Sequence, residues 1–114
     1  MATNAVEGPG KQYTPVFASI SAAGNGNNTL VAADATRKIR VLALHITPIL
    51  AVTVQFQSGA GGTNLTGVIS LGITTSLVLP YNEAGWFETA TNTLLNLSLG
   101  GATQTSGSLT YILV

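Results

Sequence analysis

Charged residues are scarce in this sequence. Asp, Glu, Lys and Arg make up 7% of its 114 residues, whereas a soluble domain devotes about a quarter of its residues to them. None lies in residues 41–82 or from Thr89 to the C-terminus. Because charged surfaces keep small proteins apart, we expect a chain this poor in charge to associate with itself or with a larger assembly.

Further absences narrow the possible functions. The chain has no cysteine, which excludes a disulfide, a thiolate metal site and a thiol nucleophile. Its four cations balance its four acids, so it lacks the basic stripe that nucleic-acid binding requires. The most apolar run, residues 41–54, contains polar residues and is too short to cross a bilayer as a helix, so we expect no membrane partner. Residues 1–11 are small and polar, unlike a secretory signal.

The residues that are present follow the pattern of short strands. No window carries apolar residues at the i, i+3, i+4, i+7 spacing of an amphipathic helix. Period-two alternation and turn residues instead predict strands at residues 13–21, 29–33, 38–47, 52–57, 65–71, 76–79, 86–90, 94–99 and 106–114. This spacing predicts an all-β fold, a jelly-roll-like antiparallel β-sandwich of about eight or nine short strands. We expect it to form one domain, residues 13–114, after a flexible N-terminal arm, residues 1–12.

Two of the predicted strands are apolar on both faces. Odd and even positions are both apolar in residues 38–47, and the same is true of residues 106–114. A strand of this kind needs a covering layer on each side. One alternative is a loop of the same chain, and the other is a neighbouring subunit. We predict a subunit interface whose candidate residues are Val41, Ala43, His45, Leu109, Tyr111 and Leu113.

Few residues are available for catalysis. His45 is the only histidine, and without a nearby carboxylate in the sequence we favour a hydrogen-bonded polar residue over a general base. Glu83 and Glu88 would resemble the carboxylate pair of a glycosidase, but solvated turn carboxylates fit better. One histidine and four scattered acids do not make a zinc or calcium site. We therefore predict neither enzymatic activity nor a metal or cofactor.

Two further groups of residues have more than one interpretation. Trp86 and Phe87 are adjacent, and we favour a plug in the core over an interface anchor. Three of the four cations, Arg37, Lys38 and Arg40, lie together before the longest predicted strand. They either dock a partner electrostatically or solubilise the turn after Asp34 and pair with it. With Lys11 in the arm they are the candidate docking residues.

Several segments together resemble a known group of proteins. In the order of its strands and in its turn sequences, the chain is similar to the small β-sandwich virion proteins of tailed bacteriophages, above all to capsid decoration (cement) proteins. The resemblance covers about residues 15–114 and brings no catalytic residues with it. The segments that carry it are residues 38–44, 52–59, 65–67, 79–89, 94–99 and 106–111.

The resemblance implies a structural virion protein, made in the host cytoplasm and located on the outer surface of a phage capsid. Decoration proteins bind an assembled shell, often as trimers at its local symmetry axes, and staple neighbouring capsomers together. The implied partners are further copies of the chain, in a homotrimer, and the major capsid protein; no small-molecule substrate is implied. Similar sandwiches occur in tails and fibres, so a receptor-binding knob or glycan-binding module is the alternative. Tyr81, Glu83 and Trp86 come nearest to such a glycan site.

Overall fold

The computed structural model describes residues 13–114. The predicted N-terminal arm, residues 1–12, and the candidate docking residue Lys11 lie outside the described residues. Within residues 13–114 the chain forms ten strands and no helix. The strands are β1 (Val16–Ala22), β2 (Gly26–Val31), β3 (Ile39–Pro48), β4 (Val52–Ser58), β5 (Thr63–Asn64), β6 (Ile69–Leu71), β7 (Leu77–Leu79), β8 (Phe87–Glu88), β9 (Leu95–Leu99) and β10 (Thr105–Leu113).

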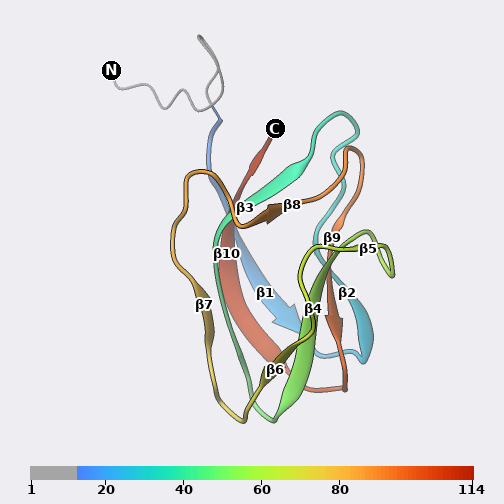
Figure 1. The fold of residues 1–114 in the computed structure, drawn as a ribbon, viewed down its shortest axis with the longest axis vertical. Helices are drawn as coiled ribbons and strands as arrows, with labels where there is room; N and C mark the ends of the chain where they lie inside the picture. The colour runs from blue at the N-terminus through green and yellow to red at the C-terminus, as the bar shows by residue number, and fades with distance from the viewer. Residues whose placement is uncertain (1–12) are drawn as a thin grey trace.

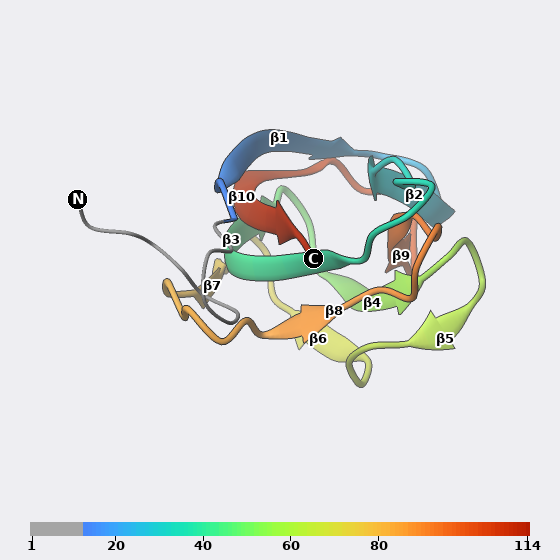
Figure 2. The same ribbon diagram turned by 90° about the horizontal axis from the view of Figure 1, so that it is seen from above.

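The strands form two antiparallel sheets that lie face to face (Figures 1 and 2). In the first sheet the order is β1-β10-β3-β7, and β8 also pairs with β3. In the second sheet the order is β2-β9-β4-β5, and β6 also pairs with β4. The first and last strands are therefore neighbours in one sheet, and β2 and β9 are neighbours in the other. This nested order is that of a jelly roll whose ten segments fill eight strand positions, which confirms the predicted fold class.

The core lies between the two sheets, and β4 shows how the sequence builds it. Val52, Val54 and Phe56 are buried, while the residues between them are partly exposed. Because successive side chains of a strand point to opposite faces, this alternation gives one core face and one outer face. The Phe56 ring stacks on Phe87 of β8 with 5.0 Å between the ring centroids. The two rings join the second sheet to the first.

A bulge in β3 explains why that strand is apolar at odd and even positions. In the pairing with β10, Thr110 lies opposite Ala43 and Tyr111 lies opposite Val41, so Leu42 is an extra residue. The extra residue reverses the alternation. Ile39 and Val41 before the bulge, and Leu44 and Ile46 after it, all belong to the core. The bulge therefore explains these four residues with one inward face. Leu42 and Ile112 of β10 are also buried but do not belong to the core cluster, so at this end of β3 the same chain covers the other face as well.

The predicted strand over residues 65–71 is regular only in its second half. Its first half is irregular because a side chain takes the place of a backbone partner: the Thr66 hydroxyl accepts the Phe56 N–H at 3.2 Å. The Leu65 N–H still donates to the Phe56 carbonyl. The second strand begins earlier than predicted, at Gly26, because the turn before it is closed by the Asn28 side chain, which donates to the Gly24 carbonyl.

Candidate functional site

Most of the predicted interface residues face the core of their own chain. Val41 is 0% exposed and Leu109 is also buried. Tyr111 and Leu113 are partly buried and pack against the same core. Val41 and Leu109 are covered within their own chain, so the interface prediction was wrong for these two. For Tyr111 and Leu113, which are partly exposed, it stays a prediction. Of the predicted set, Ala43 and His45 alone lie on the outward side of β3.

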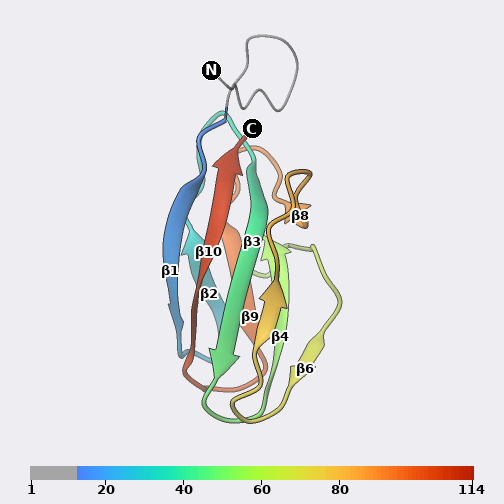
Figure 3. The ribbon, with the colours of Figure 1, turned by 90° about the vertical axis from the view of Figure 1, so that its left-hand side faces the viewer.

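Away from the Arg40–Glu88 pair, the outward side of the first sheet is an uncharged surface. The strand register aligns its side chains in rows, from Phe17 across Thr110 to Ala43, and from Ser19 across Ser108 and His45 to Val78. We call the following residues the outer face: Phe17, Ser19, Ser21, Ala43, His45, Thr47, Val78, Ser106, Ser108 and Thr110. None of them is acidic or a lysine or arginine. In Figure 3, where β1, β10, β3 and β7 lie toward the viewer, no described element crosses these strands.

A shallow hollow of about 170 Å³ lies on the outer face. Its floor is low because β3 and β10 carry small side chains there, Ala43 on one strand and Ser108 and Thr110 on the other. His45 and Val78 also line it. On the neighbouring edge strand, Phe17 projects from the same face and is 81% exposed. The outer face therefore carries a large apolar projection and a hollow side by side.

His45 and Ser108 form a hydrogen-bonded pair beside the hollow, with 2.9 Å between Nε2 and Oγ. A base within reach of a hydroxyl is the first requirement of nucleophilic catalysis. An acid that orients the imidazole and free N–H groups for an oxyanion are the others. The outer face holds no carboxylate, and the β3 and β10 backbones here are paired with each other. His45 is therefore hydrogen-bonded, as the favoured interpretation requires, and the absence of a catalytic role stays a prediction.

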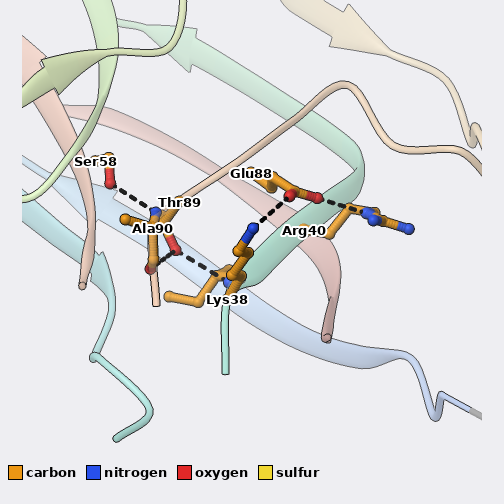
Figure 4. Close-up of polar contacts among 7 residues, drawn as sticks. Lys38, Arg40, Ser58, Glu88, Thr89 and Ala90 are labelled. Atoms are coloured by element: carbon orange, nitrogen blue, oxygen red, sulfur yellow. Dashed lines mark hydrogen bonds and ion pairs between the residues drawn. The ribbon is translucent and has the colours of Figure 1, made fainter. Parts of the chain in front are cut away.

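The three candidate docking cations that lie within residues 13–114 all contact acids. The Arg37 guanidinium lies 3.5 Å from the Asp34 carboxylate, as one of the two interpretations requires. Glu88 bridges the other two, with Lys38 Nζ at 3.7 Å and Arg40 Nε at 2.8 Å (Figure 4). Glu88 lies in a strand and is paired with two cations, so the interpretation of Glu88 as a solvated turn carboxylate was wrong. The absence of a glycosidase pair stays a prediction. The docking role of these cations stays a prediction.

Asp34 and Arg40 each stabilise the structure around them. The Thr36 backbone N–H, which donates to the Asp34 carboxylate, is the main reason that the pKa of Asp34 is lowered, and Arg37 lowers it further. The Arg40 side chain is 17% exposed and holds Glu88 of β8 against β3. Arg37 and Lys38 remain about half exposed. Arg40 is thus part of the fold, whereas Arg37 and Lys38 are surface residues.

The segment after β8 ties the two sheets together below this cluster (Figure 4). The buried Thr89 hydroxyl accepts the Ile39 N–H at 3.0 Å and donates to the Ala90 carbonyl. The Ala90 N–H in turn donates to Ser58 Oγ of the second sheet at 2.9 Å. These bonds fix the end of β3 at which the ion pairs lie.

The connection between β7 and β8 exposes two aromatic rings. Tyr81 is exposed, and Trp86 is 43% exposed with its indole N–H donating to the Pro80 carbonyl at 2.8 Å. Phe87 packs against the core. The prediction of a core plug was therefore right for Phe87 and wrong for Trp86. The candidate glycan residues Tyr81, Glu83 and Trp86 lie in this one exposed connection.

The most exposed residue of the outer face, Phe17, was missed in the sequence. It sits in a run that alternates with Val16, Ala18 and Ile20, and alternation alone does not say which set is inward. A large ring looks like a core residue by type. The signal that was present is the set of small residues Ser19 and Ser21 in phase with it, which are typical of an outward face.

Neither a metal centre nor a membrane span emerges from the described part of the chain. Within residues 13–114, no three His, Asp or Glu side chains are grouped so that they would hold a metal ion. Over the same residues, no helix has the length and apolar character needed to cross a bilayer. The sequence matches no protein-family model, and no curated protein is significantly similar to it.

Proposed function

We propose that the protein is a structural virion protein, a capsid decoration protein that self-associates and binds the outer surface of a phage head. The observation that carries the proposal is the outer face of the first sheet, which has no acidic residue, lysine or arginine and carries the exposed Phe17 beside a hollow. It adds to the resemblance of the sequence to decoration proteins, which also favours a homotrimer.

The chemistry of the outer face suits a permanent contact. Burying a charge is costly unless it is paired, and the outer face has no charge to bury. Several of its hydroxyls already have partners, since the Gln104 amide donates to Ser21 and Ser106 and the Thr47 and Ser76 hydroxyls bond each other at 2.6 Å. Small side chains let a partner surface approach closely. Such a surface supports lasting self-association.

Co-sedimentation with heads of the encoding phage that lack this protein tests the proposal. We expect saturable binding with a fixed number of copies per head. A glutamate at His45 would place a charge in the middle of the outer face and break self-association. Because a monomer attaches to the head through fewer contacts than an oligomer, His45→Glu should reduce binding at least tenfold. Val68→Glu, at another exposed apolar residue, is the matched control and should bind like the wild type. Protein that stays in the supernatant at every concentration would contradict the proposal.

A second candidate function rests on the connection between β7 and β8. Exposed aromatic rings beside a carboxylate are typical of sugar recognition, and Tyr81, Glu83 and Trp86 lie together there. A tail or fibre module that binds a host glycan is therefore the alternative. Trp86 is the only tryptophan, so its fluorescence reports on this connection alone. The decoration proposal predicts no change on titration with host surface polysaccharide, and a saturable shift would favour the glycan-binding module.

A further inference from the structure

We infer that the outer face binds the same face of a second copy of this chain, with Phe17 of each copy seated in the hollow over Ala43 of the other. This inference rests on the self-association in the proposed function and names the surface responsible. It is supported by the projecting Phe17 side chain, by the hollow over Ala43, and by the size and charge of the outer face.

The projection is Phe17. Its side chain is 81% exposed on β1, which is an edge strand of the first sheet. Aromatic rings dominate the energetics of interfaces because each buries a large apolar area. The next residues of β1 that point the same way are Ser19 and Ser21, and both have small side chains. Phe17 therefore stands above its surroundings.

The hollow has the right volume for that ring. Benzene occupies an apolar cavity of roughly 150 Å³ in a protein interior, and the hollow measures about 170 Å³. Val78 and the methyl groups of Ala43 and Thr110 supply apolar walls, while the His45–Ser108 pair forms a polar rim. In this rim His45 Nε2 and Ser108 Oγ bond each other, so these two atoms keep their partner when a ring is seated.

The positions of projection and hollow fit a twofold axis. Phe17, Thr110 and Ala43 lie in one row on three neighbouring strands, so Phe17 is about 10 Å from the floor of the hollow. If two copies meet face to face around an axis over Thr110, each ring reaches the hollow of the other copy. Such an isologous contact is closed, because it uses both rings and both hollows.

The size and charge of the face favour a second copy as the occupant. The two larger dimensions of the molecule are 45 and 25 Å, enough to supply most of the roughly 800 Å² per partner of a stable interface. A neutral face is complementary to itself, whereas a charged partner would meet no opposite charge here. The pairing predicts a dimer, in contrast to the trimer implied by the resemblance.

Disulfide mapping tests the pairing directly, because the chain has no cysteine of its own. Phe17→Cys and Ala43→Cys are made as separate variants, mixed and oxidised. The expected product is a disulfide-linked dimer with one copy of each variant, in which the second ring and hollow remain intact. Within one copy, positions about 10 Å apart are too far for a disulfide. Phe17→Cys mixed with Val68→Cys is the control and should link at least tenfold less. Equal linking in both mixtures would overturn the pairing.

Sedimentation velocity separates this inference from the proposed function. At micromolar concentration the wild type and Val68→Ser should be dimers and Phe17→Ser a monomer. A Phe17→Ser variant that stays oligomeric and binds heads overturns the pairing and leaves the decoration function standing. A monomeric wild type whose binding to heads is lost in Phe17→Ser also overturns it, because the capsid is then the occupant. A wild-type dimer that Phe17→Ser dissociates, but that does not bind heads, supports the pairing and contradicts the function.

Discussion

Asn96 lies at the centre of the outward side of the second sheet and is nevertheless fully buried. Its amide group donates to Asn27 at 3.0 Å and to Gln57 at 2.9 Å, and the Gln57 amide donates to Asn64 at 2.9 Å. Four amides on β2, β9, β4 and β5 therefore form one hydrogen-bonded row. The row holds four strands in register on a side that has no apolar cover of its own.

Removing the central amide should destabilise the protein. Asn96→Ala leaves two amide oxygens without their donor, and we expect the free energy of unfolding to fall by about 1–3 kcal/mol. Ser98→Ala, two residues along the same strand, is the control, with an expected change below about 0.5 kcal/mol. Urea denaturation measures both. Equal losses for the two variants would show that the amide row does not stabilise the sheet.

Arg40 and Arg37 should differ in their effect on stability although both contact an acid. Arg40 is the less exposed and forms the shorter bond, 2.8 Å to Glu88, and its side-chain stem packs on Gly85 so closely that a Cβ there would lie 2.5 Å from Cγ. Arg40→Ala should therefore cost about 1–2 kcal/mol. Arg37→Ala removes an exposed pair and should cost less than about 0.5 kcal/mol. Thermal denaturation of both variants checks this, and the reverse order would contradict it.

Among the strands, β3 marks the limit of what the sequence predicts. Its existence and length were predicted within a residue, because a long apolar run between polar turns is typical of a strand. The bulge at Leu42 could not be predicted, because it depends on the pairing with β10 and the local sequence gives no signal of it. Because Leu42 is an extra residue, the Val41 side chain points into the core and not to the same face as Ala43. The interface prediction failed at Val41 for that reason, while β4, which has no bulge, was predicted correctly.

Deleting Leu42 tests the role of the bulge. Without Leu42, the core residues Ile39, Val41, Leu44 and Ile46 follow one regular alternation, so all four can still face the second sheet. We therefore expect the deletion variant to keep a cooperative thermal transition, at a lower stability because the buried Leu42 side chain is lost. Leu42→Ala keeps the extra residue and should also fold, with a loss of about 2–5 kcal/mol. A deletion variant without a cooperative transition would show that the fold requires the bulge.

At the scale of the whole molecule, the two ends of the sandwich differ. The ion pairs of Asp34 and Glu88 lie near the beginning of β3, next to the C-terminus, where Val114 and Lys38 exchange backbone hydrogen bonds. At the other end of β3 the Thr74 N–H donates to the Pro48 carbonyl, and this joins two loops. The exposed apolar residues of these loops are Ile49, Leu50 and Ile73. The two ends are distinguishable, so a bound molecule has a defined orientation that can be determined.

The proposal that the protein binds the outer surface of a phage head is tested most directly by cryo-electron microscopy of heads. Heads that lack the protein and heads incubated with it are reconstructed and subtracted. If the protein is a decoration protein, we expect difference density of the size of this sandwich at regularly repeated positions on the outer surface of the shell. Heads without difference density, with the protein found at the tail of complete particles, would contradict it.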